Sequence, residues 1–465
     1  MIFDTVVRGG LIGTAEAVFR ADIGIRDGRI AALGEELGPG KKEVDASNRL
    51  VLPGGVDSHC HIEQMSAAGV MTADDFVSAT TGAAFGGTTT VISFAAQQRG
   101  ADLEQTVTDY AKRAEHGALV DYSFHMIVTD PNARTLAQLP DLIRQGHRSI
   151  KLFMTYDRLK VDDEQMLAVL RLAHETGATV CVHAENHGMI AWASEWLFAA
   201  GHTAPRYQPM SHPRLAETEA FHRLIAMAEL VDHPITIFHV STAEGAEIVR
   251  EARRRGVRVT AETCSHYLLL TADELDRPGL EGGKWCCSPP LRTASDQEAL
   301  WEALARRDLQ IVSSDHAPYS WDEAGKLKNG PNATFKQIAN GLPGLELRQM
   351  LMFDAMVSQE RMTVSDFVEL TATAPATHYG LYPKKGTISI GADADLVLWN
   401  PERRTTVTWT DLHDRTGYTP FEGRQLRGFP ETVLLRGTAI VDEGELLTAP
   451  GSGRFLPRFA SDAGL

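Results

Sequence analysis

Strand-like apolar segments alternate with helical segments through the middle of the chain, and this alternation limits the fold more than any other feature. Eight such segments occur: RLVLPGGVDSHCH, TTTVISFAA, DYSFHMIV, SIKLFM, TVCVHA, ITIFHVST, RVTAETCSHY and IVSSDHAP. Helical patterns separate most of them; residues 162–177, for example, begin with acidic residues and end at a glycine. Eight strands alternating with helices predict an α/β fold, a TIM-like (β/α)8 barrel. The alternative, a doubly wound open sheet, usually has a Gly-rich turn after its first strand, where this chain has His-Cys-His.

Short strands and turns mark both ends of the chain. Residues 1–53 contain β-rich runs, one of them folded around Asp27-Gly28, which is a strong hairpin signal. A similar set occupies residues 384–445. We therefore expect both chain ends to form one small β-sandwich, residues 54–383 to form the barrel, and residues 446–465 to form a C-terminal tail.

Composition excludes several classes of partner. The 465 residues carry a formal net charge of −16, which argues against binding to nucleic acid or to an anionic membrane. We see neither a signal peptide nor an apolar stretch of the ~20 residues that a membrane helix requires. The five cysteines lack zinc-knuckle spacing. Free thiols in a reducing cytoplasm are the expected state, and a cytoplasmic location follows.

Two histidines stand two residues apart at the end of the first strand-like run. On a β-strand, residues i and i+2 point to the same face, so His59 and His61 would aim at one point while Cys60 turns away. This geometry suits a metal ion. This motif alone is more often a pair of structural histidines, so the rest of the chain has to decide.

Further polar residues lie near the ends of the later strand-like runs. They are Lys151, His183, His239 and Asp315. In a (β/α)8 barrel the carboxyl ends of the strands meet at one rim, so these side chains would converge there with His59 and His61. Each histidine alone could be structural. Together, four histidines and an aspartate at one rim predict a metal site, because buried polar groups need partners.

Lys151 does not match the other residues, since a protonated ammonium would repel metal cations. A lysine inside an apolar strand has a depressed pKa, because burial disfavours its charged form. Its neutral amine can react with carbon dioxide to give a carbamate, a carboxylate on a long arm that could bridge two metal ions. The alternative is a lysine paired with a carboxylate, and both interpretations remain open on the residue pattern alone.

The motifs, in this order, resemble those of a known family. PGGVDSHCH, SIKLF, VHAEN, FHVST, CSPPLR and SSDHAP are similar to motifs of the cyclic amidohydrolases, and most of all to the dihydropyrimidinase/hydantoinase branch. The resemblance extends over nearly the whole chain, including GADADLVLWNP near its end. It implies a homotetrameric hydrolase that acts on C–N bonds of small cyclic amides.

The resemblance also implies a binuclear metal centre, usually with Zn²⁺, although Mn²⁺ or Co²⁺ would also fit. It assigns one ion to His59, His61 and Asp315, the other to His183 and His239, and the bridge to carboxylated Lys151. Tyr156 would stabilise an oxyanion, and the backbone at Ser288 and Asn340 would bind the ring amide.

The implied reaction follows from the stability of an amide towards water. A hydroxide that bridges the metal ions would attack the ring carbonyl, which the ions also polarise. Tyr156 would donate a hydrogen bond to the developing oxyanion, and Asp315 would transfer the proton to the leaving nitrogen. The product is an N-carbamoyl amino acid from a dihydropyrimidine or a hydantoin.

Three related classes fit less well. A dihydroorotase typically has an arginine where this chain has Glu63, and a nucleobase deaminase usually lacks the bridging lysine. The collapsin response mediator proteins share the expected fold but are assembly proteins without the metal centre, whereas this chain keeps every ligand position.

The chain departs from its family beside the pocket. Gln64 and Ser66 stand where an apolar pair usually lies over the ring substituent. We therefore expect a preference for small or polar substituents, with cyclic imides and other cyclic ureides as alternative substrates. A shifted loop that turns both residues away from the substrate is the competing interpretation.

Overall fold

A closed, parallel eight-stranded barrel forms the centre of the molecule. The computed structural model describes residues 2–459. Within this range the barrel strands are β8 (Gly55–Cys60), β9 (Thr88–Ala96), β10 (Asp121–Ile127), β11 (Ser149–Phe153), β12 (Thr179–His183), β13 (Ile235–Ile237), β14 (Val259–Cys264) and β15 (Ile311–Ser313). Each strand pairs with the next one along the chain. A parallel bridge between Cys60 and His316 joins the last strand to the first. The predicted barrel is confirmed.

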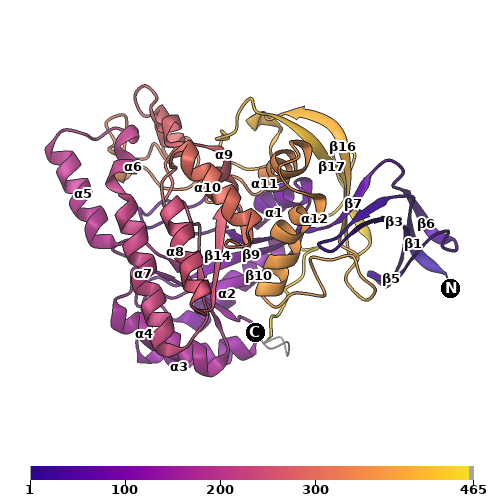
Figure 1. Ribbon diagram of the computed structural model, residues 1–465, viewed down its shortest axis with the longest axis horizontal. Helices are drawn as coiled ribbons and strands as arrows, with labels where there is room; N and C mark the ends of the chain where they lie inside the picture. Colours follow the sequence, from indigo (N-terminus) through magenta and orange to yellow (C-terminus); the bar gives the residue numbers. More distant parts are fainter. Residues whose placement is uncertain (1, 460–465) are drawn as a thin grey trace.

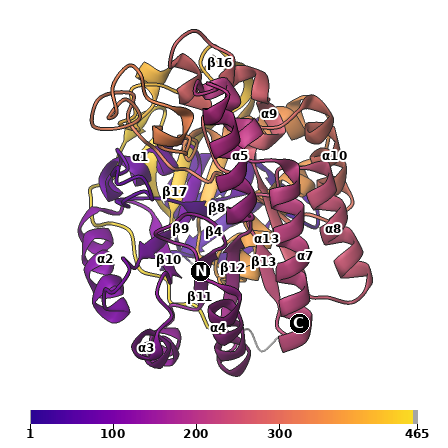
Figure 2. The same ribbon diagram turned by 90° about the vertical axis from the view of Figure 1, so that its left-hand side faces the viewer.

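Helices connect the barrel strands and surround them (Figure 2). The longer ones are α1 (Phe76–Phe85), α2 (Leu103–Gly117), α3 (Ala133–Arg144), α4 (Asp163–Thr176), α5 (His187–Ala199), α7 (Arg214–Val231), α8 (Ala243–Arg254) and α10 (Ala294–Ala305). Shorter ones are α6 (Gln208–Ser211), α9 (Ser265–Leu269), α11 (Leu347–Phe353), α12 (Val364–Val368) and α13 (Ala374–His378). None of the helices in residues 2–459 has the length and apolar character needed to cross a membrane.

Helix α4 shows how local sequence sets the bounds of an element. Asp162 caps its N-terminus in a reciprocal arrangement with Gln165, and Gly177 ends it with a φ of 70°. A glycine adopts this left-handed conformation without steric cost. The helix expected over residues 162–177 is therefore confirmed.

The two chain ends build two sheets beside the barrel (Figure 1). Strands β1 (Phe3–Arg8), β4 (Asp22–Arg26), β5 (Arg29–Gly34) and β6 (Gly40–Asp45) form the smaller sheet. Strands β2 (Leu11–Gly13), β3 (Val18–Arg20), β7 (Leu50–Pro53), β16 (Leu396–Thr406), β17 (Gln425–Leu435), β18 (Thr438–Asp442) and β19 (Glu445–Leu446) form the larger one. Apolar side chains such as Ile25 and Leu398 pack together in their shared core. The expected pairing of both chain ends is confirmed; the exact domain boundaries stay a prediction.

The predicted hairpin at Asp27-Gly28 connects β4 to β5. Both turn residues have positive φ angles, 52° and 75°. Positive φ at both central residues is the mark of a type I′ turn, whose twist matches that of the flanking strands.

The first strand-like run, RLVLPGGVDSHCH, contributes one strand to the sandwich and one to the barrel. Its beginning is β7, which pairs with β16 of the larger sheet, and its end is the barrel strand β8. Gly54 stands between them, where an added Cβ would lie 2.0 Å from the Thr89 hydroxyl oxygen. Close approach to β9 therefore requires a glycine at the point where the chain passes from sandwich to barrel.

The C-terminal segment returns to the barrel instead of extending from it. The Tyr122 amide donates to the Arg454 carbonyl (3.0 Å), and the Leu456 amide donates to the Tyr122 carbonyl (2.7 Å). Arg458 is buried there and donates to the Ser149 hydroxyl. The expected tail thus packs as part of the domain as far as residue 459, and its last six residues, 460–465, lie outside the described residues.

Candidate metal centre

A cavity of about 550 Å³ opens at the carboxyl ends of the barrel strands. All of the site residues expected from the sequence line it: His59, His61, Lys151, Tyr156, His183, His239, Ser288, Asp315 and Asn340. They come from five barrel strands or the segments that directly follow them, and from two longer loops, one before and one after β15. Barrel closure is what brings them together, because the carboxyl ends of all parallel strands face the same side.

Two histidines and an aspartate meet at one point of this cavity. The Nε2 atoms of His59 and His61 lie 3.0 and 3.2 Å from Oδ1 of Asp315. The ligand atoms of these residues all lie within 4.8 Å of one another. Cys60 points the other way, with its Sγ 3.8 Å from the Ile92 carbonyl oxygen. The expected i, i+2 geometry is present, although His61 stands one residue beyond the end of β8.

The ring nitrogens of these histidines that face away from Asp315 also have partners. His59 Nδ1 contacts the Glu262 carboxylate, and His61 Nδ1 lies 2.7 Å from Oε1 of Gln64. Each oxygen accepts a hydrogen bond from Nδ1–H, which leaves the Nε2 lone pair free to bind a metal. Histidine ligands of protein metal sites typically have such outer partners.

Glu185 organises the other half of the cavity. His183 donates from Nε2 (2.7 Å), His212 from Nδ1 (2.8 Å) and Ser288 from its hydroxyl (2.7 Å) to this one carboxylate. Burial alone would raise the pKa of Glu185, but the two histidines hold it well below its usual range. The buried carboxylate of Glu185 therefore fixes both the candidate metal ligand His183 and the candidate substrate-binding residue Ser288.

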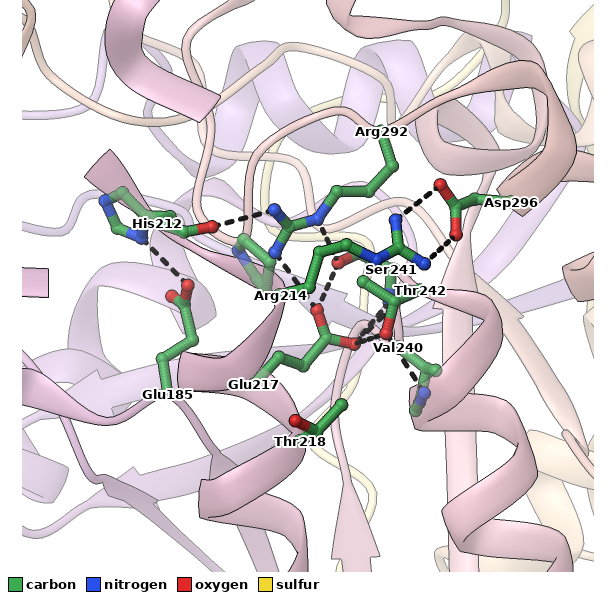
Figure 3. A network of polar contacts seen from close by, with 12 residues as sticks. Glu185, His212, Arg214, Glu217, Thr218, Val240, Ser241, Thr242, Arg292 and Asp296 are labelled. Carbon is green, nitrogen blue, oxygen red and sulfur yellow. Dashed lines mark hydrogen bonds and ion pairs between the residues drawn. The ribbon is translucent and has the colours of Figure 1, made fainter. Parts of the chain in front are cut away.

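A polar network continues from Glu185 to the next strand (Figure 3). The His212 carbonyl accepts from Arg292 (2.8 Å), and the Arg292 guanidinium lies 3.3 Å from the Glu217 carboxylate. Glu217 in turn accepts from the Ser241 amide (3.0 Å), two residues after His239. These contacts fix the carboxyl end of β12 and the chain directly beyond β13, where His183 and His239 lie.

Lys151 is buried to 99% (1% exposed), and its ammonium lies 4.0 Å from the centre of the Phe238 ring. Within residues 2–459 it makes neither a hydrogen bond nor an ion pair, so the alternative of a lysine paired with a carboxylate does not describe this structure. Burial lowers the pKa of Lys151 to about 8, even though Asp315 and Glu262 act in the opposite direction. This environment makes the neutral amine far more accessible near neutral pH than it is in an exposed lysine.

Two further residues, Tyr156 and Asn340, offer hydrogen bonds to a bound molecule. Burial raises the pKa of Tyr156, so its phenol stays protonated. The hydroxyl can therefore donate a hydrogen bond to an oxyanion. Tyr156 also has a φ of 70°, and His239 and Asp315 have φ angles of 42° and 45°. The buried Oδ1 of Asn340 has no partner among the described residues. Non-glycine residues in this strained region cluster at functional sites.

Comparison with known proteins decides the family. Residues 50–440 match the model of the amidohydrolase family. The chain belongs to this family. It is 43% identical to a D-hydantoinase of Ralstonia pickettii over 98% of this chain and 99% of that protein.

Solved structures agree with this assignment. A D-hydantoinase structure superposes with a TM-score of 0.95 at 42% identity, covering 98% of this chain and 99% of that one. The dihydropyrimidinase of Brevibacillus agri superposes with a TM-score of 0.95 at 36% identity, with the same coverage. The resemblance inferred from the motifs is confirmed.

The donor set fits the binuclear metal centre that the amidohydrolase family implies. Imidazole and carboxylate groups are suitable zinc ligands, and the outer partners of His59, His61 and His183 leave one ring nitrogen of each available. The buried Nδ1 of His239 and the ammonium of Lys151 have no partner in the described part of the chain. A metal-free role would leave both buried groups unsatisfied.

Two glutamates of this amidohydrolase site were not predicted from the sequence. Glu262 and Glu185 hold His59 and His183, whereas Gln64 was expected beside the substrate and not as a partner of His61. For the two glutamates a signal existed, since each stands within or directly after an apolar strand, in RVTAETC and CVHAEN. A charged residue there needs a buried partner.

Gln64 and Ser66 do line the cavity, as the sequence interpretation required. However, the Gln64 carbonyl oxygen is occupied by His61, and the Ser66 hydroxyl accepts from the Val70 amide at 3.0 Å. Glu63 turns away from the cavity, where its carboxylate accepts from the Phe76 amide at 3.1 Å. The contact between Gln64 and His61 was not expected.

Proposed function

We propose that the protein hydrolyses a small cyclic amide, opening a hydantoin or dihydropyrimidine ring to an N-carbamoyl amino acid. The observation that carries this proposal is the convergence of four histidines, Lys151 and Asp315 on one cavity. The similarity to a D-hydantoinase and a dihydropyrimidinase over nearly the whole chain supports the choice of substrate class.

The proposed site holds two divalent ions, with Zn²⁺ as the first choice and Mn²⁺ or Co²⁺ as alternatives. His59, His61 and Asp315 would hold one ion and His183 and His239 the other, with carboxylated Lys151 between them. When bound, the ions would activate water and polarise the ring carbonyl. The unpaired Lys151 amine and the outer partners of the histidines support this assignment.

The chain's own groups supply binding and proton transfer. Tyr156 donates its phenol proton as a hydrogen bond to the carbonyl oxygen as negative charge develops there, a contact worth roughly 3 kcal/mol in comparable sites. Asp315 accepts a proton from the attacking water and returns it to the leaving ring nitrogen. The backbone at Ser288 and Asn340 holds the ring amide.

Cyclic imides and other cyclic ureides are the second candidate substrates. The polar residues Gln64 and Ser66 line the cavity, and the side-chain NH2 group of Gln64, whose carbonyl oxygen is held by His61, would stay unpaired against a bulky apolar ring substituent. Small or polar substituents are therefore the proposed preference.

We also propose a homotetramer in a reducing cytoplasm. Trp192 and Trp196 on α5 are 68% and 57% exposed, and tryptophans of this kind are enriched at protein interfaces. The five cysteines are all free thiols, which supports the reducing compartment.

A substrate panel tests the proposed reaction. Dihydrouracil, hydantoin, 5-phenylhydantoin and glutarimide would be incubated with the metal-loaded enzyme and the products identified by mass. We expect a mass gain of one water for at least one ring, with dihydrouracil or hydantoin preferred over 5-phenylhydantoin. Failure to open any of these rings would contradict the proposed function.

A further inference from the structure

Lys326 is a buried lysine that serves no candidate ligand. It lies in the long segment between β15 and α11, and its side chain is 0% exposed. Its ammonium donates to the carbonyl oxygens of Gly283 (2.9 Å) and Cys286 (3.1 Å) and lies 3.5 Å from that of Lys284. Three backbone carbonyls of one short segment thus converge on one ammonium.

The charge of Lys326 has no acidic partner within residues 2–459. The ammonium also lies over the Tyr418 ring, whose centre is 5.9 Å from Nζ. An isolated buried charge is costly. Burial lowers the pKa of Lys326 to about 8, which is the expected effect of such an environment. A neutral side chain of similar length, such as methionine, would avoid the free-energy cost of burying a charge. The presence of a lysine therefore indicates that its hydrogen bonds to the carbonyls have a role.

The two segments that Lys326 joins both lead into the cavity. The segment that accepts its hydrogen bonds continues from Cys286 to Ser288, and the segment that carries Lys326 continues to Asn340. The Gly341 amide donates to the same Cys286 carbonyl at 2.9 Å. Ser288 and Asn340 are the two positions whose backbone is expected to bind the ring amide. Cys286 is therefore a shared contact directly beside both.

Lys326 cannot touch a bound ring, because it does not line the cavity. Its influence must pass through the backbone. Hydrogen bonds to several carbonyls of one segment fix its peptide planes, and the orientation of those planes decides where the amide and carbonyl of Ser288 point. The side chain of Gln208 adds one more such bond, to the Cys287 carbonyl at 2.6 Å.

We propose that Lys326 is a positioning residue for substrate binding: it locks the Ser288 segment to the Asn340 segment so that their backbone groups meet the ring amide together. This inference rests on the proposed function, because it assumes that a ring amide occupies the cavity. It concerns affinity for the substrate and not the metal centre, since none of the candidate ligands contacts Lys326.

The test is the substitution Lys326→Met, which keeps the length of the side chain and removes the donors. The carbonyls of Gly283, Lys284 and Cys286 then lose the ammonium donor, although Cys286 keeps the bond from the Gly341 amide. The Ser288 segment relaxes, and the ground state and the transition state lose the same contacts. With dihydrouracil and hydantoin as substrates, we expect KM to rise about tenfold or more while kcat stays within about threefold. Metal content per chain should equal that of the wild type.

Lys284→Met is the matched control. Lys284 belongs to the same segment, but its side chain pairs with Glu281 and does not line the cavity. This variant should keep the wild-type KM. Lys326→Gln provides a second variant that retains an amide donor, and we expect its KM to lie between those of the wild type and Lys326→Met.

The possible outcomes separate the two claims. A wild-type protein that opens no ring of the substrate panel contradicts the proposed function. If the wild type is active, an unchanged KM in Lys326→Met contradicts the role of Lys326. The role is also contradicted if Lys326→Met loses metal, or if its kcat falls while its KM stays that of the wild type. If Lys326→Met does not fold, Lys326→Gln decides: a KM raised about threefold or more supports the proposal, and a wild-type KM overturns it.

Discussion

At the scale of single residues, the three histidines with known outer contacts do not have equivalent partners. Glu262 and Glu185 offer carboxylates to His59 and His183, whereas His61 donates to the neutral carbonyl of Gln64. A carboxylate partner makes an imidazole a stronger base and a better ligand. His61 should therefore be the histidine whose bond to a metal depends most on the exact placement of its partner.

Substitution of Gln64 tests this difference. Gln64→Met removes the acceptor for His61 Nδ1–H and should weaken metal retention by roughly tenfold or more, whereas Gln64→Glu should strengthen it. The measurement is the rate at which a chelator removes zinc from the loaded protein. Ser66→Ala, which changes another residue of the cavity lining without contacting a histidine, is the control. Equal rates in all four proteins would show that Gln64 does not orient His61.

At the scale of helices and strands, much of the fold could be predicted because local signals agree with the tertiary structure. Strands buried on both faces read as continuous apolar runs, and this is why all eight barrel strands could be located. The capped helix α4 and the Asp27-Gly28 turn carry their own local signals.

Other elements carry no such signal. The division of the first run into β7 and β8 depends on pairing with β16, a partner far away in the sequence. The contacts of Lys326 are made to backbone carbonyls, which any sequence could provide. The packing of Arg458 beneath the barrel likewise depends on a long-range contact. Such features follow from the closed fold and could not be read from residue patterns.

Helix α5 is the element whose surface most needs a partner. Trp192 and Trp196 are one helical turn apart and share a face of α5. The short helix α6, which carries the exposed Met210, packs against α5 (Figure 1). Exposed apolar patches of this kind mark interaction sites. The homotetramer proposal assigns this face to contact with a second copy of the chain.

Changing both tryptophans to glutamate should therefore break the assembly. We expect the wild type to have the mass of a tetramer by sedimentation, and the Trp192→Glu/Trp196→Glu variant to have a smaller mass with an unchanged far-UV spectrum. The control is Leu230→Glu. Leu230 is an exposed apolar residue at the C-terminal end of α7, outside the proposed interface, and this variant should remain a tetramer. A double variant of wild-type mass would exclude α5 from the interface.

At the scale of the whole molecule, the sandwich and the barrel are joined by a buried ion cluster. The ammonium of Lys385 lies 2.6 Å from Asp121, 3.0 Å from Asp393 and 2.7 Å from Asp395. Asp121 begins the barrel strand β10, and Asp395 directly precedes β16 of the larger sheet. The cluster thus helps to hold the strand that leaves the sandwich in register with the barrel.

The candidate ligands could be predicted because a parallel barrel gathers strand ends from the whole chain. His59 and Asp315 lie at opposite ends of the barrel sequence, and closure places their side chains 3.0 Å apart. The partners that hold these ligands could be predicted only in part: the position of Glu185 after an apolar strand indicates a buried charge, but the histidine it holds, like the contact of Gln64 with His61, is seen only in the folded chain.

The central claim is that this cavity is a metal centre for opening cyclic amides, and one measurement tests it most directly. Metal content and ring-opening activity would be determined on the same preparation before chelation, after chelation and after zinc is restored. We predict about two divalent ions per chain in the active protein, loss of ring opening in the stripped protein, and recovery as zinc returns. Full ring-opening activity in protein shown to be free of metal would contradict the account.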